Sequence, residues 1–314
     1  MTDKIAIVGA GLIGRAWAIV FARAGRQVAL YDPDPLVLPV ALETIGVNLA
    51  DLAESGLIAD PAETIQRIEP VKSLEAALHG ALYVQENGPE NLAIKQALFR
   101  ELDRLADPGA VLASSSSALR ASLFTEDLPG RARCLVAHPV NPPYLVPLVE
   151  LSPAPWTSRD TVARTRALME AVGQVPVELK KEIPGFLLNR LQGALLGEAF
   201  RLVEQGYCGM ADIDKTVKDG LGLRWSFMGP FETVDLNAPG GIADYIRRYG
   251  TAYHEMARSA GAPESWGDAL TARLEEERRQ TLPSDKLGER AAWRDRRLMA
   301  LLVHKRKARE RIGG

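Results

Sequence analysis

A glycine-rich loop near the start of the chain constrains the fold more than any other feature. Residues 4–8 form a short β-rich run, and the loop Gly9-Ala10-Gly11-Leu12-Ile13-Gly14 leads from it into helix-forming residues 15–24. A second β-rich run over residues 27–31 ends at Asp32. Strand, G-x-G-x-x-G loop, helix and an acidic residue about 20 positions further on form the fingerprint of a dinucleotide-binding βαβ unit. The pattern therefore predicts parallel strands with helices packed on the faces of their sheet.

In a dinucleotide-binding unit each glycine of this loop has a physical role. The alternative interpretation of the motif is a glycine-rich turn that binds no ligand. Gly9 permits the tight turn, Gly14 lets helix and strand pack closely, and Gly11 lets a pyrophosphate approach the backbone. The helix N-terminus attracts the phosphates. Asp32 accepts hydrogen bonds from the adenosine ribose and repels a 2′-phosphate, which favours NAD over NADP. The predicted NAD contacts in this region are Gly9, Gly11, Leu12, Ile13, Gly14 and Asp32.

After this unit the sequence keeps alternating between helical and β-rich segments. A helical hairpin is predicted near residues 36–67, with breaks at Gly56 and Pro61. Further strands are predicted at residues 81–86, 111–113, 134–137 and 176–179. The alternation predicts an α/β fold in which residues 1–182 form a Rossmann-type, doubly wound, mainly parallel sheet.

The second part, residues 183–314, is predicted to be an all-helical domain for substrate binding and dimerisation. Residues 186–204 are apolar with few charges, so we expect a buried helix there. Residues 220–225 are predicted to form a loop. Further helices are expected near residues 241–260, 266–281 and 288–311.

The composition excludes several classes of function. The 314 residues carry a formal net charge of -2, which gives no reason to expect nucleic acid as a partner. No apolar run of about 18 residues occurs, so no membrane span is expected. The two cysteines, Cys134 and Cys208, lack Cys-x-x-Cys spacing, so we expect reduced, buried thiols and no metal site. Met1 leads directly into a strand without a signal peptide, which predicts a cytoplasmic protein.

A second chemical feature lies in the middle of the chain, where His138 ends an apolar strand. A stiff loop with four prolines follows, and Glu150 lies inside the returning apolar run. Two such strands can place an imidazole beside a carboxylate, which is the pairing that a general base needs. The alternative is that His138 caps a strand while Glu150 is a solvated strand residue.

Five motifs together point to one known superfamily. They are the glycine-rich loop at residues 9–14, Ser117 in a serine loop, His-x-x-Asn-Pro at residues 138–142, Glu150 twelve residues after the histidine, and Pro-Gly-Phe-x-x-Asn-Arg at residues 184–190. With this set the chain resembles the 3-hydroxyacyl-CoA dehydrogenase superfamily over essentially its whole length. The segments at residues 137–144, 222–225 and 293–295 look most like the lambda-crystallin / L-gulonate 3-dehydrogenase branch.

The resemblance assigns roles to individual residues. It implies that His138 and Glu150 form the catalytic dyad, and that Ser117 and Asn189 line the substrate and nicotinamide site. Without it, Ser117 is a turn serine that satisfies its own backbone and Asn189 a solvated residue at a helix start. It further implies cofactor contacts from Glu90, Lys95, Ser117 and Asn141. One departure is that Pro139 and Val140 follow the histidine, where the acyl-CoA enzymes usually carry aromatic residues.

Four hypotheses for function remain open after this comparison of motifs. The first is NAD-dependent oxidation of a free 3-hydroxy acid such as L-gulonate. The second is oxidation of a 3-hydroxyacyl-CoA ester, and the third is oxidation of L-carnitine. The fourth is a crystallin-like structural protein that binds NAD without turnover. The complete set of catalytic residue types argues against the fourth, because a structural protein has no chemical need for it.

The charges of the helical hairpin favour the free acid. Residues 41–67 contain five acidic residues and one cation, Arg67, and a surface of that sign repels the phosphates of CoA. A free acid needs a local clamp for its carboxylate, and Arg224 is the candidate because a guanidinium binds a carboxylate through two hydrogen bonds. The alternative is that Arg224 only pairs with a surface acid. The resemblance also implies a homodimer built through the helical domain.

Overall fold

The computed structural model describes residues 4–259 and 267–313. Residues 1–3, and the predicted helix ends at residues 260 and 266, lie outside the described residues. The chain divides into two compact units. One comprises Met1–Arg190 together with Arg294–His304, and the other comprises Leu191–Trp293 together with Lys305–Gly314.

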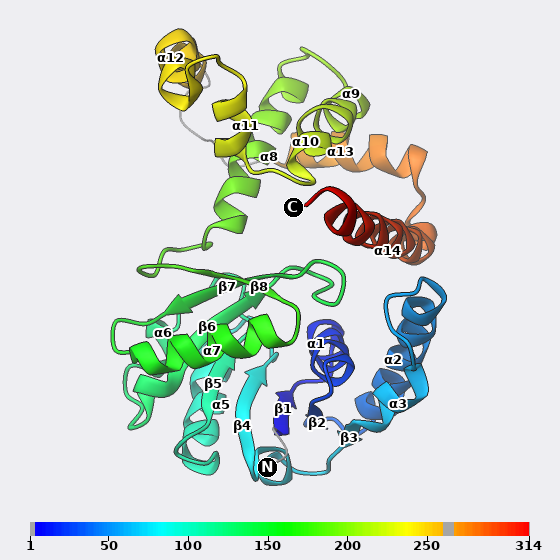
Figure 1. The fold of residues 1–314 in the computed structure, drawn as a ribbon, viewed down its shortest axis with the longest axis vertical. Coiled ribbons are helices and arrows are strands. Elements are labelled where there is room, and N and C mark those ends of the chain that lie inside the picture. The colour runs from blue at the N-terminus through cyan, green and yellow to red at the C-terminus, as the bar shows by residue number, and fades with distance from the viewer. Residues whose placement is uncertain (1–3, 260–266, 314) are drawn as a thin grey trace. The chain divides into compact units, whose positions relative to one another are not determined.

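The first unit is built on a single eight-stranded sheet (Figure 1). Its strands are β1 (Lys4–Val8), β2 (Gln27–Tyr31), β3 (Ile68–Pro70), β4 (Ala81–Glu86), β5 (Val111–Ser114), β6 (Cys134–Pro139), β7 (Leu148–Pro153) and β8 (Val175–Glu178). The order across the sheet is β3-β2-β1-β4-β5-β6-β7-β8, and each described pair is parallel except β6 with β7. The predicted Rossmann-type, mainly parallel sheet is confirmed.

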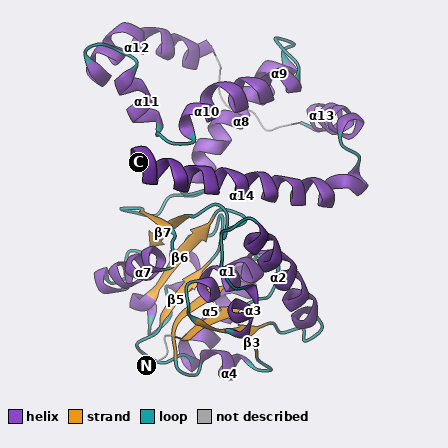
Figure 2. Cartoon of the chain, turned by 45° about the vertical axis from the view of Figure 1, so that its right-hand side comes forward, coloured by secondary structure: helices purple, strands orange, loops and turns teal. Residues whose placement is uncertain are grey.

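Helices pack on both faces of this sheet (Figure 2). They are α1 (Leu12–Arg23), α2 (Val37–Glu54), α3 (Pro61–Gln66), α4 (Leu74–Leu78), α5 (Leu92–Leu105), α6 (Ser122–Thr125) and α7 (Arg159–Ala171). One core lies under α1, α2 and α7, and the other under α4, α5 and α6. The helical hairpin predicted near residues 36–67 is present as α2 and α3.

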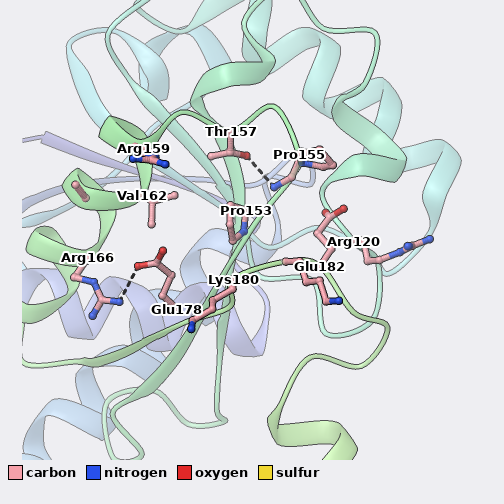
Figure 3. Close-up of a pocket in the computed structure, with 13 residues that line it drawn as sticks. Arg120, Pro153, Pro155, Thr157, Arg159, Val162, Arg166, Glu178, Lys180 and Glu182 are labelled. Atoms are coloured by element: carbon pink, nitrogen blue, oxygen red, sulfur yellow. Dashed lines mark hydrogen bonds and ion pairs between the residues drawn. The ribbon is translucent and has the colours of Figure 1, made fainter.

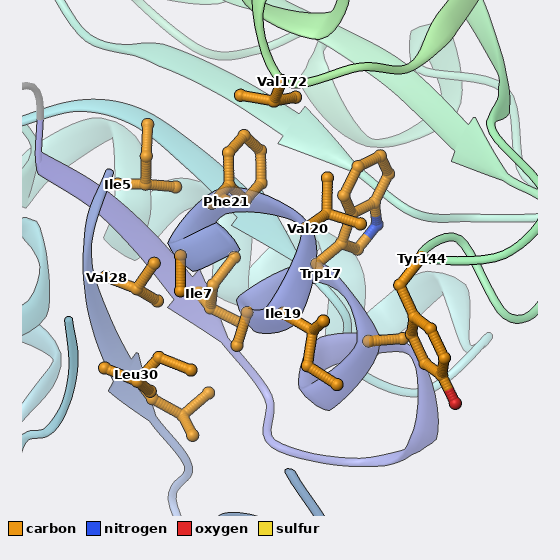
Figure 4. Packing of buried hydrophobic residues seen from close by; sticks show 14 of the residues in the cluster. Ile5, Ile7, Trp17, Ile19, Val20, Phe21, Val28, Leu30, Tyr144 and Val172 are labelled. Atoms are coloured by element: carbon orange, nitrogen blue, oxygen red, sulfur yellow. The ribbon is translucent and has the colours of Figure 1, made fainter. Parts of the chain in front are cut away.

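Helix α1 is the centre of the larger core (Figure 4). Its Trp17 and Phe21 are fully buried and stack with their ring centroids 5.5 Å apart. Side chains of β1 and β2 pack beside them, including Ile7 and Val28. This packing fixes α1 beside β1 at the two ends of the glycine-rich loop.

The second unit is helical. Its helices are α8 (Leu188–Glu204), α9 (Met210–Lys215), α10 (Gly222–Trp225), α11 (Pro230–Leu236), α12 (Gly241–Ser259), α13 (Asp268–Thr281) and the two ends of α14 (Leu287–Ile312). The middle of α14, Arg294–His304, belongs to the first unit. A helical turn over Thr216–Leu221 connects α9 with α10, so the loop predicted at residues 220–225 is wrong. The backbone continues its helical hydrogen bonding through Gly220 and Gly222, which local sequence had marked as breaks.

The expectation of a buried helix at residues 186–204 is also wrong. Within the described chain, α8 buries only Val203, and Leu191 is 70% exposed. The apolar face that suggested burial is present, but the described residues leave most of it exposed. In contrast, the middle of α14 is anchored on the sheet unit, where Ser55 donates a hydrogen bond to the sulfur of buried Met299 (3.2 Å).

The structure also bears on two predictions from the composition, that both cysteines are reduced and buried and that no segment spans a membrane. Cys134 and Cys208 are both free thiols; Cys134 is buried as predicted, whereas Cys208 is only half-buried. Burial raises the pKa of the Cys134 thiol to about 12. In the part of the chain that the structure describes, no helix has the length and apolar character needed to cross a membrane.

Candidate active site

The antiparallel pairing of β6 with β7 places His138 directly opposite Glu150 in the strand register. Their side chains point to the same face of the sheet, and Nδ1 of the imidazole lies 2.8 Å from Oε2 of the carboxylate. Both side chains are buried. The alternative in which Glu150 is a solvated strand residue therefore does not describe this structure.

The other oxygen of the Glu150 carboxylate binds the start of α8. Oε1 accepts hydrogen bonds from the backbone N–H groups of Leu187 (2.7 Å) and Leu188 (2.9 Å). Gly185 and Phe186 both have positive φ, at 76° and 49°, and this turn directs the two N–H groups at the carboxylate. These bonds explain why residues 183–190 group with the sheet, beyond the predicted domain end at residue 182.

Glu150 stays ionised in this environment. Burial raises the pKa of its carboxyl group, but the hydrogen bonds from His138, Leu188 and Leu187 outweigh burial and hold that pKa below its usual value. An ionised carboxylate can only accept a hydrogen bond. Beside Nδ1 it therefore favours the imidazole tautomer that carries its proton on that nitrogen. The Nε2 atom, for which no partner occurs among the described residues, is then the basic atom of the ring.

The ring of Phe186 lies 5.5 Å from the ring of His138 and limits the positions the imidazole can adopt. Phe186 is fully buried, although its φ of 49° is unusual for a residue other than glycine. A side chain held this firmly against the imidazole supports a site with a fixed geometry. In the sequence, the only signal for Phe186 is its place in the Pro-Gly-Phe motif.

The serine loop after β5 is fastened by Glu90 and Asn189. Oε1 of Glu90 accepts hydrogen bonds from Oγ of Ser116 (2.6 Å) and from the backbone N–H groups of Ala118 and Leu119. Burial raises the pKa of Glu90, but these bonds together with Lys95 lower it overall. The amide of Asn189 donates to the carbonyl oxygen of Ser117 (2.9 Å), so these two predicted site residues lie together.

Lys95 is fully buried beneath this loop. Its ammonium group donates to both oxygens of Glu86, at 3.0 and 2.8 Å, and to Oγ of Ser114 at 3.3 Å. These three bonds use all of its donors. A direct contact with the cofactor stays a prediction for Lys95, whereas the role visible here is to neutralise Glu86. Glu86 was missed, although a charged residue ending an apolar strand was the available signal.

A second buried polar network lies next to the Lys95–Glu86 pair, and the sequence did not predict it either. Oγ of Ser115 accepts hydrogen bonds from Trp17 (3.0 Å) and Gln85 (2.7 Å) and donates one to the side-chain oxygen of Asn87 (2.7 Å). Gln85 also accepts a bond from the hydroxyl of Tyr83. The network joins α1, β4 and the serine loop, and a serine run by itself contains no signal for it.

The glycine-rich loop has the shape that a bound dinucleotide requires. A Cβ on Gly9, whose φ is 93°, would lie 2.9 Å from the carbonyl oxygen of Asn87, and one on Gly14 would lie 1.8 Å from that of Gly9. Both positions need glycine for internal reasons. Gly11 differs, because nothing lies within 4 Å of its added Cβ. The protein itself does not need a glycine there, which fits a requirement set by the cofactor.

The neighbouring groups fit NAD as well. Among the described residues no side chain caps the N-terminus of α1, which begins at Leu12 and Ile13, and the first N–H groups of a helix lack partners within it and suit a phosphate. At the end of β2, Asp32 accepts hydrogen bonds from the backbone N–H groups of Ala10 (2.8 Å) and Asp34 (3.0 Å). Its carboxylate is thereby held beside the loop, where an adenosine ribose would bind.

Two predicted site residues are less constrained by the structure. Asn141 is exposed just after β6, and Arg224 is exposed on α10 in the helical unit. Their contacts with cofactor and substrate stay predictions. Among the described residues, no group of three or more His, Cys, Asp or Glu side chains has an arrangement that would hold a metal ion.

Comparison with known proteins finds one family whose models match both the N-terminal and the C-terminal part of the chain. The family model for the 3-hydroxyacyl-CoA dehydrogenase NAD-binding domain matches residues 4–183, and the model for its C-terminal domain matches residues 185–279. A lambda-crystallin homolog from Bos taurus is 45% identical over 302 residues, covering 95% of this chain and 94% of that protein. An L-carnitine dehydrogenase from Streptomyces coelicolor is 36% identical over 262 residues, which cover 83% of this chain and 82% of that protein.

Among solved structures, 5-formyl-3-hydroxy-2-methylpyridine 4-carboxylic acid 5-dehydrogenase, an NAD+-dependent dismutase, has a similar fold over the whole chain. The TM-score is 0.82 at 28% sequence identity, and the match covers 96% of this chain and 97% of that one. The similarity therefore includes both the sheet unit and the helical unit.

The open space at Gly11 generates a prediction. Gly11→Ala should fold normally, because its φ of −67° suits alanine, and stability should stay equal or rise by about 0.4–1 kcal/mol. The added methyl group would meet the pyrophosphate, so we expect the Kd for NADH to rise at least about tenfold. Fluorescence titration with NADH and thermal unfolding measure the two effects. Gly14→Ala is the contrasting variant and should lose stability; unchanged NADH affinity in Gly11→Ala would contradict the assignment.

Proposed function

The chain belongs to the 3-hydroxyacyl-CoA dehydrogenase family of NAD-dependent dehydrogenases, and from this premise we propose that it oxidises a free 3-hydroxy acid, L-gulonate-like in type, to the 3-oxo acid. The observation that carries the proposal is the buried hydrogen bond between His138 and Glu150. It supplies a general base of fixed tautomer at the carboxyl end of β6, the edge of the sheet where ligands bind in doubly wound folds.

In this proposal His138 removes the proton from the substrate hydroxyl through Nε2. Bound NAD supplies the hydride acceptor for the same carbon atom. Glu150 stabilises the imidazolium that forms, because its charge is held 2.8 Å from Nδ1 by two backbone N–H groups on its other oxygen. Ser117 and Asn189, which are joined by a hydrogen bond, are the proposed donors to the reacting oxygen.

Substitution of the dyad tests this mechanism. His138→Asn should lower turnover by about 10²-fold or more, the usual size of a lost general base, while NADH affinity changes little. Glu150→Gln should also impair turnover. It should also change the pH profile of turnover, because the variant lacks the carboxylate that stabilises the charged form of the base.

Steady-state kinetics across a pH series, with NADH titration as the folding control, measure both variants. Activity near that of the wild type in His138→Asn at neutral pH would refute the assignment.

The charges on α2 and α3 support a free acid over a CoA ester. Glu43, Glu54 and Asp60 are exposed there, and the one cation of this segment, Arg67, is paired with Glu63. No cation of the segment is thus left to bind the phosphates of CoA. The relative with the similar whole-chain structure also carries a carboxylic acid in its name. A 3-hydroxyacyl-CoA ester and L-carnitine are the alternative substrates.

For the carboxylate of a free acid we propose Arg224 as the clamp. Its guanidinium has no ion pair among the described residues, and two parallel hydrogen bonds to a carboxylate suit its planar fork. L-Carnitine would need a further site for its cationic group, whereas a CoA ester has no free carboxylate for Arg224 to bind.

A substrate panel separates these alternatives. Wild-type enzyme with NAD should oxidise free 3-hydroxy acids with a higher kcat/KM than 3-hydroxybutyryl-CoA, measured by NADH absorbance. Arg224→Met should raise KM for the acid at least about tenfold, the effect of losing a charge-assisted pair, and leave NADH binding intact. Much faster turnover of the CoA ester than of any free acid would overturn the substrate assignment.

We also propose that the protein is a cytoplasmic homodimer assembled through its helical unit. Helix α12 has no buried residue, and one of its faces is an exposed apolar stripe that consists of Ile242, Ile246, Tyr249, Tyr253 and Met256. Exposed Leu191 and Leu195 on α8 add to the apolar surface of this unit. Contiguous apolar surface of this kind marks a protein interface. Two free cysteines suit the reducing cytoplasm.

Light scattering tests the homodimer. Wild-type protein should have the mass of two chains at micromolar concentration, and Ile246→Glu should shift it toward the monomer, because a buried charge opposes assembly. Thr251→Glu is the matched control, since Thr251 lies half a helical turn away from the stripe on the same helix. A monomeric wild-type protein would refute the proposal.

A further inference from the structure

A pocket of about 740 Å³ lies away from the dyad, beside the first turn of α7 and the chain that leaves β8. None of the residues of the proposed active site lines it. Figure 3 shows Arg159, Lys180 and Arg120 on different sides of the pocket, with Pro153 between them. Its volume is within the range of pockets that bind small molecules, which is about 300–1,000 Å³.

The charges around this pocket are not balanced by the protein. Of its two acidic side chains, Glu178 pairs with Arg166 at 3.0 Å, and Glu182 accepts a hydrogen bond from the backbone N–H of Ser122 at 2.9 Å. Four cations that line the pocket have no ion pair among the described residues; they are Arg120, Arg159, Lys180 and Lys181. This concentration of positive charge is unexpected in a chain with a net charge of -2.

The rest of the pocket lining is largely apolar and suits an apolar part of a ligand. The apolar part of the lining includes Pro153, Ala154, Pro155 and Val162. Helix α7 begins at Arg159, so the positive end of its dipole adds to the field at the pocket. A ligand that satisfies both features has several negative charges at one end and a flat apolar group at the other.

We propose that this pocket binds a nucleoside polyphosphate, in addition to the NAD bound by the glycine-rich loop. The phosphates pair with Arg159, Lys180 and Lys181, and the base lies on the wall formed by Pro153 and Pro155. Guanidinium and ammonium groups provide the charge-assisted hydrogen bonds that phosphate oxygens accept.

Calorimetric titration of the NADH-saturated enzyme tests the proposal, because saturation prevents the probe from occupying the NAD site. The probes are ATP, inorganic tripolyphosphate and adenosine. The pocket variant is Arg159→Ala combined with Lys180→Ala. The control is Lys72→Ala with Arg100→Ala, two exposed cations outside the pocket without ion pairs among the described residues, which removes the same charge.

ATP should bind the wild type and the control equally, and at least about tenfold more weakly to the pocket variant. Tripolyphosphate should show the same loss in the pocket variant, and adenosine should bind at least about tenfold more weakly than ATP. The affinity of the wild type for ATP should also fall as salt is added, which needs no variant. No ATP binding by the wild type, equal affinity in the two double variants, or adenosine as tight as ATP would overturn the proposal.

Discussion

The arrangement of the site depends on the hydrogen bonds that the Glu150 carboxylate accepts through both of its oxygens. One oxygen holds the imidazole of His138, and the other holds the first backbone N–H groups of α8. Three parts of the chain, β6, β7 and the turn at Gly185 and Phe186, therefore meet at one buried charge. A buried carboxylate is costly unless both oxygens are satisfied, so the antiparallel register and the turn before α8 have to form together. The same contact fixes the position of the imidazole that we propose as the base.

Buried polar groups at the carboxyl ends of β4 and β5 support this site from below. Lys95 and Glu86 are a fully enclosed ion pair, and loss of either partner would leave an uncompensated charge, which typically costs about 3–5 kcal/mol. Ser115 connects α1 with the strand that carries Gln85. Glu90 then fastens the loop that presents Ser117. The proposed reaction thus depends also on buried polar groups, such as Glu86 and Ser115, that hold the serine loop and the neighbouring strands in place.

Charge is distributed unevenly over the sheet unit, and this distribution bears on its ligands. The exposed acids of α2 and α3 make that surface a poor partner for phosphates, which is the basis for proposing a free acid. The four cations Arg120, Arg159, Lys180 and Lys181, which have no ion pair in the part of the chain that the structure describes, have the opposite sign and line a separate pocket. A net charge of -2 conceals both regions, because it is a sum over the chain and carries no information on position.

The sequence by itself determined the fold class, because the glycine-rich loop, the alternation of strands with helices and Asp32 are local patterns with a local physical cause. The two strands and the stiff proline loop also allowed His138 and Glu150 to meet, and the resemblance to a known superfamily made that pairing the expectation. Tertiary structure decided the rest. The ion pair of Lys95 with Glu86, the clamp of Glu90 on the serine loop and the bonds from Leu187 and Leu188 to Glu150 join segments distant in the chain. The exposure of α8 was mispredicted for the same reason, because an apolar helix face shows that burial is favourable without showing which surface, in this chain or another, covers it.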